Sequence, residues 1–194
     1  MNLLHVDSSA LGAYSVSREL SGAIVDAWKR RHPGTHVTYR DVAAQPLAHW
    51  TPVADASDPA VRLGAEVLEE FLDADVIVIG APMYNFSIPS TLKAWIDRVA
   101  VAGKTFRYGA NGPQGLAGAK RVILASSRGG YYGADTPSAA MDFQEAYLRQ
   151  LFGFLGVTDI EIVRAEGVAV GVEQKAQAIA SAHAAIHASE RLAA

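Results

Sequence analysis

Hydrophobic residues along the chain follow two alternating spacings. Short runs rich in β-branched residues are followed by longer segments in which apolar residues recur at every third or fourth position, which is the spacing of an amphipathic helix. Such alternation is typical of repeated β-α units around a parallel sheet. The expected strands are residues 3–7, 36–40, 76–80, 121–126 and 160–164.

The run Val76-Ile77-Val78-Ile79 has no polar residue at alternate positions, so we expect a central strand covered on both faces. A helix start is indicated by Asp58-Pro59, and Pro89 lies early in another helix. A last, Ala-rich helix is expected over residues 173–192. The other helices are predicted by Leu20/Ile24/Ala27/Trp28, Val67/Leu68/Phe71/Leu72, Leu92/Trp95/Ile96/Val99 and Leu148/Leu151/Phe152/Leu155.

Five strands alternating with five helices predict an α/β fold, a doubly wound three-layer sandwich with a five-stranded parallel sheet. Two strand orders are common for such sheets, and in both the ligand binds at the C-terminal ends of the strands. We expect one domain over residues 1–194. The Gly-rich residues 103–118 are interpreted as one long surface excursion.

Composition narrows the function classes. The chain has 17 basic and 20 acidic residues without a basic run, which argues against nucleic acid or an anionic membrane as partner. It has no cysteine, which excludes disulfides, thiolate nucleophiles and Cys-held metal sites. The N-terminus lacks a signal-peptide pattern, and no window approaches the roughly 20 apolar residues of a membrane span. A cytoplasmic protein is expected.

The loop after the first strand is rich in hydroxyl groups. Ser8, Ser9, Ser15 and Ser17 lead into the first helix, and the loop lacks both G-x-G-x-x-G and the P-loop motif. Hydroxyls and backbone N–H groups at a helix N-terminus favour an anion such as a single phosphate monoester. The alternative is that these serines only cap the helix and form turns.

Two further loops follow predicted strands. Met83-Tyr84-Asn85-Phe86 offers an apolar surface and an amide that could contact a planar heteroaromatic ring, although such side chains also serve as packing at the edge of a core. Ser127-Arg128-Gly129-Gly130 offers glycines that allow close backbone approach. By itself, Gly-Gly indicates no more than a turn.

These segments resemble the FMN-dependent NADH:quinone oxidoreductases, also called bacterial azoreductases, a branch of the flavodoxin-like flavoproteins. The resemblance runs from the first strand to about Gly171. The motifs that carry it are Met83-Tyr84-Asn85-Phe86-Ser87-Ile88-Pro89-Ser90-Thr91-Leu92-Lys93, Thr105-Phe106-Arg107-Tyr108 with Asn111-Gly112-Pro113, Ser127-Arg128-Gly129-Gly130 and Leu151-Phe152-Gly153-Phe154-Leu155-Gly156.

The resemblance implies the flavodoxin-like strand order 2-1-3-4-5, bound FMN, NADH or NADPH as donor, and quinones and aromatic azo compounds as acceptors in ping-pong order. It implies a homodimer with active sites at the interface, for which Phe106, Tyr108, Tyr131 and Tyr132 are candidate exposed aromatics. Residues 43–58 are short for the family, which leaves substrate range open. Implied cofactor residues are Ser9, Ser15, Val16 and Ser17 for the phosphate, Met83, Tyr84, Asn85 and Phe86 along the isoalloxazine, and Ser127, Arg128, Gly129 and Gly130 at its other edge.

Other chemistries are weaker. No catalytic base is named, because hydride transfer belongs to the flavin. A serine hydrolase lacks the G-x-S-x-G motif, and an electron carrier of this fold tends to be more acidic than a net charge of -3. His183 and His187 are interpreted as a solvated helix face rather than a metal site, His5 as a packed, hydrogen-bonded side chain, and Asp7 as part of the phosphate loop's surroundings rather than a phospho-acceptor.

Overall fold

A computed structural model describes residues 1–52 and 55–189 of the chain. The main strands are β1 (Asn2–Asp7), β2 (His36–Asp41), β3 (Val76–Pro82), β6 (Arg121–Ser127) and β7 (Asp159–Ala165). The helices are α1 (Val16–Arg31), α2 (Pro59–Asp73), α3 (Ser90–Val99), α4 (Phe143–Phe154) and α5 (Val172–Ala188), with short 3-10 turns η1 (Gly12–Tyr14) and η2 (Ala139–Met141).

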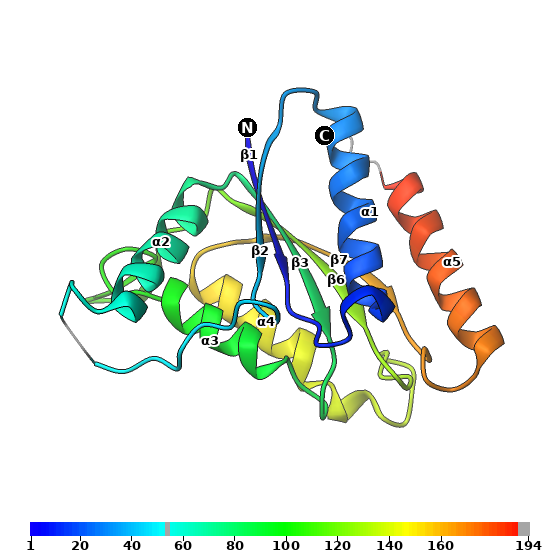
Figure 1. Ribbon diagram of the computed structural model, residues 1–194. Helices are drawn as coiled ribbons and strands as arrows, with labels where there is room; N and C mark the ends of the chain where they lie inside the picture. Colours follow the sequence, from blue (N-terminus) through cyan, green and yellow to red (C-terminus); the bar gives the residue numbers. More distant parts are fainter. Residues whose placement is uncertain (53–54, 190–194) are drawn as a thin grey trace.

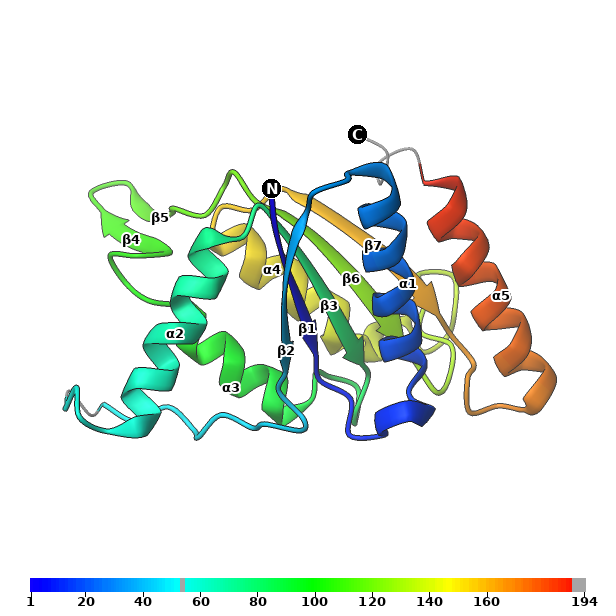
Figure 2. The same ribbon diagram turned by 45° about the horizontal axis from the view of Figure 1, so that its top comes forward.

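The five main strands form one parallel sheet in the order β2-β1-β3-β6-β7. Counted within this sheet alone, that is the order 2-1-3-4-5. Helices α1 and α5 cover one face, and α2, α3 and α4 cover the other (Figures 1 and 2). The predicted three-layer α/β sandwich and its flavodoxin-like strand order are therefore confirmed.

Side-chain caps mark the starts of α1, α2 and α4. The Asp58 carboxylate accepts a hydrogen bond from the Ala60 N–H at 2.7 Å, with Pro59 in the first helical position. Helix α5 ends at Ala188, earlier than predicted, because Ser189 has extended backbone; residues 190–192 of that prediction lie outside the described residues. Within the described part of the chain, no helix is long and apolar enough to cross a membrane.

Strand β3 lies at the centre of the sheet and is buried along its whole length. Its side chains alternate between the two faces. Ile77 and Ile79 pack with α2, α3 and α4, whereas Val76 and Val78 pack with α1 and α5. Burying each such side chain contributes about 1.5–3 kcal/mol to the free energy of unfolding. A polar residue here would lose that contribution, which explains why the strand is apolar at every position of the predicted run.

Strand β1 alternates differently, because its α1 face carries polar groups. Leu4 and Val6 pack into the core beneath α2, α3 and α4. On the opposite face, the His5 Nε2 lies 2.9 Å from the Ser21 Oγ of α1, and Ser21 donates to the Asp7 carboxylate at 2.7 Å. His5 is thus the packed, hydrogen-bonded side chain that the sequence indicates.

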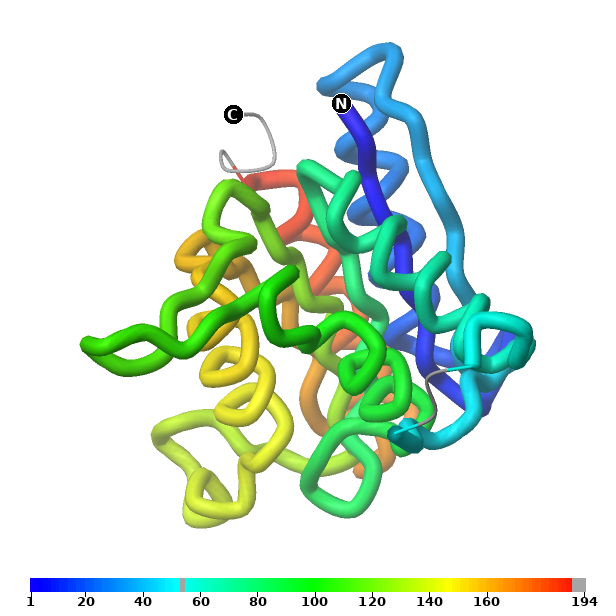
Figure 3. Tube along the Cα trace, turned by 90° about the vertical axis from the view of Figure 1, so that its left-hand side faces the viewer, coloured from blue at the N-terminus to red at the C-terminus, as the bar shows by residue number. Residues whose placement is uncertain are grey.

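Residues 103–118 are more ordered than predicted. They contain an antiparallel hairpin of β4 (Phe106–Gly109) and β5 (Gly112–Gly115), which extends outward from the body of the protein (Figure 3). Phe106 packs on Phe154 of α4, with ring centroids 4.7 Å apart. Phe106 and Tyr132 are half-buried, so the expectation of exposure is wrong for these two aromatics.

The two ends of the described chain lie at the same edge of the sheet. β1 begins there, and α5 runs back to it from the opposite edge (Figure 1). At that edge the Arg31 guanidinium donates to the carbonyl oxygens of His187 and Ser189 at 3.0 and 3.4 Å. The loops that follow the C-terminal ends of the strands lie at the other edge.

The hairpin makes a testable contact with the turn that follows α4. A Cβ on Gly115 would stand 2.1 Å from the backbone nitrogen of Gly156, so Gly115→Ala forces the backbone to shift and should reduce the free energy of unfolding by about 1–3 kcal/mol. Gly153→Ala is the control, since a Cβ there meets nothing within 4 Å and the helix gains up to about 1 kcal/mol. Urea titration of both variants measures this, and equal midpoints would contradict the packing described.

Candidate functional site

Three loops meet where β1, β3 and β6 end. We call them the first loop (residues 8–15), the second loop (residues 83–89) and the third loop (residues 128–133). The hydrogen bonds of the sheet continue into them, with Ser8 N–H donating to the Gly80 carbonyl at 3.2 Å and Met83 N–H to the Ser127 carbonyl at 2.8 Å. The structure therefore brings together the three segments singled out in the sequence.

The first loop and the first turn of α1 collect hydrogen-bonding groups. Ser9, Ser15 and Ser17 are buried; the Ser15 and Ser17 hydroxyl oxygens are 3.1 Å apart, and Ser15 also accepts from the Arg18 N–H. Among the described residues, no protein group accepts from the N–H of Val16 or of Ser17. This end of α1 therefore offers free N–H donors, hydroxyls and the positive end of the helix dipole to an anion.

The second loop is tied to the first by Tyr84. Its hydroxyl accepts from the Ala10 N–H at 3.1 Å and lies 3.3 Å from the Ser9 hydroxyl. Asn85 and Phe86 both have left-handed backbone, with φ of 48° and 70°. Asn tolerates this region better than most residues, whereas a bulky residue there is unusual. The turn leaves Asn85 and Phe86 exposed and Met83 half-buried.

The third loop is held by a buried guanidinium. The Arg128 side chain is 1% exposed and forms ion pairs with Asp142, Glu145 and Glu166 at 2.8, 2.5 and 3.1 Å. The backbone N–H of Arg128 donates to the Ala165 carbonyl, and the backbone carbonyl of Arg128 accepts from the Val168 N–H. Arg128 therefore directs its polar groups into the protein and fixes the loop from behind.

The glycines after Arg128 face the other way. In the described structure, the N–H groups of Gly129 and Gly130 have no protein acceptor. A Cβ on Gly130 would stand 3.3 Å from the Tyr132 ring, and that ring lies edge-on to Phe86 of the second loop, with centroids 6.1 Å apart. Two free donors thus lie beside an aromatic surface shared by the second and third loops.

Glu145 is a buried carboxylate that pairs with Arg128 of the third loop and with Arg164 of β7. It is 5% exposed and receives Arg164 through two hydrogen bonds of 2.8 and 2.7 Å. Burial raises the pKa of the Glu145 carboxyl, but the hydrogen bonds from Arg164 and the charges of Arg128 and Arg164 outweigh burial, so the pKa lies below its usual range. Glu145 is therefore held as a carboxylate.

Two hollows adjoin the predicted residues. One of about 660 Å³ is lined by Ser9, Ser15, Arg18 and Asp41 among others. The other, of about 530 Å³, is lined by Tyr84 and Asn85 together with residues of α3 and α4. The first and second loops therefore border concave surfaces of the size that small ligands occupy.

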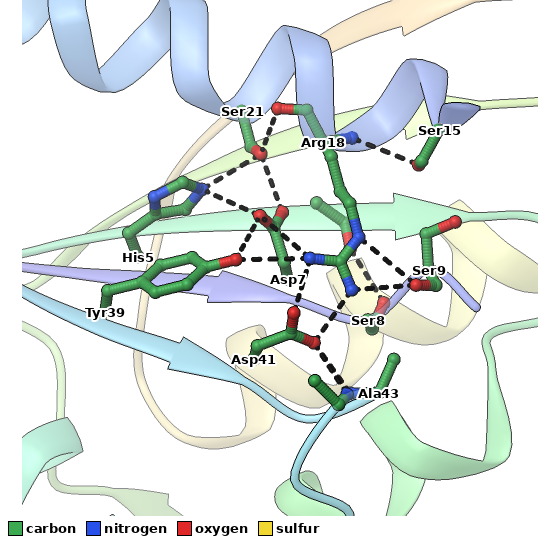
Figure 4. A network of polar contacts seen from close by, with 12 residues as sticks. His5, Asp7, Ser8, Ser9, Ser15, Arg18, Ser21, Tyr39, Asp41 and Ala43 are labelled. Atoms are coloured by element: carbon green, nitrogen blue, oxygen red, sulfur yellow. Dashed lines mark hydrogen bonds and ion pairs between the residues drawn. The ribbon is translucent and has the colours of Figure 1, made fainter. Parts of the chain in front are cut away.

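Sequence reasoning missed a polar network beneath the first loop (Figure 4). The Arg18 guanidinium joins the Ser9 carbonyl to the Asp41 carboxylate, and Tyr39 donates to Asp7 at 3.1 Å. Asp7 is 3% exposed within this network. One signal was available, because predicted strands 3–7 and 36–40, if adjacent and in register, bring Asp7 beside Asp41.

The two histidines of α5 do not act together. His183 Nε2 lies 3.0 Å from a Glu19 carboxylate oxygen of α1, and His187 is exposed. Over residues 1–52 and 55–189, no group of three or more His, Cys, Asp or Glu side chains is arranged to hold a metal ion.

The geometry defines a class of protein. A doubly wound parallel sheet in the order β2-β1-β3-β6-β7, with loops gathered where β1, β3 and β6 end, is the flavodoxin-like arrangement. Residues 1–189 match the family model described as having a flavodoxin-like fold, and the chain belongs to that class.

More specific relatives narrow the class. The chain is 61% identical over 192 residues to FMN-dependent NADH:quinone oxidoreductase 1 of Xanthomonas axonopodis pv. citri, covering 98% of this chain and 97% of the relative. It is 57% identical to FMN-dependent NADH:quinone oxidoreductase 2 of Bradyrhizobium diazoefficiens, covering 94% and 95%. The chain therefore belongs to the FMN-dependent NADH:quinone oxidoreductase family of enzymes.

A solved structure agrees with this assignment. The crystal structure of an azoreductase from Bacillus anthracis str. Sterne superposes with a TM-score of 0.88 at 28% identity, covering 100% of this chain and 99% of that one.

The buried carboxylate gives a pH-dependent prediction. At neutral pH, Glu145→Gln should lower the free energy of unfolding by about 3 kcal/mol, because it breaks a buried ion pair. A lowered pKa contributes stability above the unfolded value of about 4.3, and that stability is lost as pH falls through the folded value. The difference from wild type should therefore shrink below about pH 4.

Denaturant titrations between pH 3 and pH 7 measure this difference. The control is Glu69→Gln, which changes an exposed carboxylate on α2 and should shift stability by less than about 0.5 kcal/mol throughout. A constant penalty for Glu145→Gln across the whole pH range would show that charge is not what Glu145 contributes.

Proposed function

We propose that the protein is an FMN-dependent NAD(P)H:quinone oxidoreductase that also reduces aromatic azo compounds, by two-electron hydride transfer in ping-pong order. One observation carries the proposal: hydroxyls and free N–H donors at the start of α1 lie at the same sheet edge as the aromatic second loop and the free N–H groups of Gly129 and Gly130. The names of the relatives and of the similar azoreductase support the chemistry.

The phosphate end of FMN fits the first loop. Ser9, Ser15 and Ser17 supply hydroxyls, and Val16 and Ser17 supply N–H groups whose partners are missing within the described protein. A dianionic phosphate monoester is stabilised by such donors at a helix N-terminus. A bound phosphate needs no lysine or arginine side chain at these groups, because charge-assisted hydrogen bonds from N–H groups are strong.

The ring end of FMN fits the second and third loops. In this proposal Met83, Tyr84, Asn85 and Phe86 line one side of the isoalloxazine, and the segment from Ser127 to Gly130 closes its other edge. Arg128 contributes by holding that segment in place, since its own polar groups are paired within the protein.

FMN, when bound, supplies the hydride chemistry. The protein holds the ring and leaves one face open for the nicotinamide donor and then for the acceptor. The N–H groups of Gly129 and Gly130, which have no acceptor within the described protein, would donate to the bound ring where negative charge develops, because preorganised donors gain most there. No side chain is assigned as a base, and protons for the acceptor come from solvent.

The wider setting is also part of the proposal. We infer a single cytoplasmic domain over residues 1–194 that forms a homodimer with active sites at the interface and binds neither nucleic acid nor membranes. Exposed aromatics favour a covered surface: Tyr131 in the third loop is 48% exposed, and Phe143, whose N–H donates to the Phe86 carbonyl of the second loop, is 61% exposed. Tyr108, on the β4–β5 hairpin at the opposite end of the sheet, is 75% exposed.

The proposal is tested in one cuvette. The protein is incubated with FMN and desalted, and then NADH and a benzoquinone are added in turn. Flavin bands should remain after desalting, bleach with NADH and return with quinone, and initial rates against both substrates should give the parallel double-reciprocal lines of ping-pong order. Retention without bleaching would favour an electron carrier, and a protein that retains no flavin would disprove the assignment.

Two substitutions of Asn85 distinguish what its side-chain amide contributes to FMN binding from what its left-handed backbone contributes to stability. Asn85→Gly removes the amide while keeping the left-handed backbone accessible, so FMN affinity should fall by about three- to tenfold while the melting temperature changes little. Asn85→Ala loses the same amide and adds strain of about 1 kcal/mol or more, so it should also lower stability.

His187→Ala is the control for both Asn85 variants. His187 is exposed in the last turn of α5, and that end of α5 lies away from the three loops (Figure 1). Its replacement should change neither FMN affinity nor the flavin potential. FMN fluorescence quenching measures the affinities. Equal effects from His187 and Asn85 would remove Asn85 from the site.

A further inference from the structure

We propose that Arg18 is a positioning residue for the FMN phosphate, acting through the first loop rather than by touching the phosphate. The inference deepens the proposed function and rests on its assignment of the phosphate to the first loop. It is drawn from the polar network in Figure 4, in which one guanidinium is shared between that loop and the end of β2.

The Arg18 side chain fixes the peptide plane after Ser9. Its Nε and Nη2 both donate to the Ser9 carbonyl oxygen, at 3.2 and 2.8 Å. A carbonyl held by two donors from a planar group has little freedom to turn. The next N–H, that of Ala10, points to the Tyr84 hydroxyl, so the orientation set by Arg18 passes into the contact with the second loop.

The backbone of Arg18 holds Ser15, a second serine assigned to the phosphate. The Arg18 N–H donates to the Ser15 hydroxyl at 3.3 Å, and that hydroxyl lies 3.1 Å from the Ser17 hydroxyl. Ser9 and Ser15, six positions apart in the sequence, are thus both attached to Arg18. A change in the side chain of Arg18 should move one relative to the other.

The far side of the guanidinium is anchored to β2. Arg18 Nη1 and Nη2 donate to the two Asp41 carboxylate oxygens at 2.6 and 2.8 Å. Asp41 also accepts from the Ala43 and Ala44 N–H groups. Asp41 is therefore held by the turn that follows β2, and it transmits that rigidity to Arg18.

The charge of Arg18 is already balanced inside the protein. Asp41 forms a bidentate pair with it, and an Asp7 carboxylate oxygen lies 3.7 Å from Nη1. The Tyr39 hydroxyl accepts from Nη1 at 3.2 Å. A guanidinium facing two carboxylates and a carbonyl has no edge left for a phosphate, which distinguishes positioning from direct binding.

Riboflavin provides the discriminating probe, because it has the ring of FMN without the phosphate. In Arg18→Gln the first loop is no longer held in place, so hydrogen bonds between that loop and the phosphate are lost and FMN binding should weaken by about tenfold. Riboflavin binding should stay within about twofold of wild type. The measured quantity is the ratio of the two dissociation constants, obtained from quenching of flavin fluorescence.

Arg18→Lys tests whether FMN binding depends on the planar guanidinium, with its several donors, or only on the positive charge. A lysine keeps the charge as a point donor, but it cannot hold the Ser9 carbonyl and both Asp41 oxygens at once. We expect the FMN-to-riboflavin preference of Arg18→Lys to remain below wild type. Asp41→Asn, which leaves Arg18 in place and removes its anchor, should reduce the preference in the same direction and keeps the test open if Arg18→Gln fails to fold.

The matched control is Arg40→Gln. Arg40 is also a buried guanidinium held by two carboxylates, Glu66 and Glu70, but it contacts α2 instead of the first loop. Its replacement should lower the melting temperature without changing the FMN-to-riboflavin ratio.

The outcomes distinguish failure of the Arg18 inference from failure of the proposed FMN-binding function. If FMN and riboflavin weaken in parallel in Arg18→Gln, or if Arg18→Lys binds FMN like wild type, Arg18 does not position the phosphate loop. If wild type itself binds riboflavin as tightly as FMN, the assignment of the phosphate to the first loop fails before any variant is considered.

Discussion

The hydrogen-bond ladder of the parallel sheet is the constraint on which the site depends. In a parallel sheet all strands end at one edge, and their last carbonyl and N–H groups still need partners. Here the ladder runs on into the loops: Val42 N–H donates to Asp7, Met83 N–H to Ser127 and Arg128 N–H to Ala165. Each loop therefore leaves the sheet along a defined path, which makes precise placement of ligand groups possible.

Two arginines extend that control beyond the ladder. Arg128 binds three carboxylates behind the third loop, and Arg18 binds a carboxylate and a carbonyl beneath the first. Both charges are neutralised internally, so the donors that remain without a protein acceptor at the described loops are mainly backbone N–H groups, such as those of Gly129 and Gly130. Such groups are neutral and pay little desolvation when a ligand enters, whereas exposed cations would attract other anions as well.

The sequence predicted what depends on periodicity and local capping. The fully apolar run at β3 and the Asp58-Pro59 helix start need only neighbours along the chain, and both were found as expected. The β4–β5 hairpin was missed because its strands are rich in glycine and lack alternation; it is stabilised by packing on α4. The partners of Arg18 and Arg128 were missed for a related reason, because they come from elements that only the folded register brings near.

The convergence of the three loops was anticipated from the sequence, whereas the contacts between them were not. Loops after β1, β3 and β6 could be chosen from the rule that ligands bind at strand ends, but the link from Tyr84 to the first loop could not. Side-chain hydrogen bonds between loops depend on the separation of strand ends and on turn conformation. The left-handed backbone of Asn85 is in keeping with its residue type, but nothing in the sequence marks the same conformation at Phe86.

The placement of the chain ends has a practical consequence. Met1 and Ser189 both lie at the edge of the sheet away from the three loops (Figure 1). A fusion partner or a surface attachment at the N-terminus would therefore stand on the opposite side from the three loops that we propose to hold the flavin. The molecule can be mounted on an electrode or a support from that end with these loops still facing the solution.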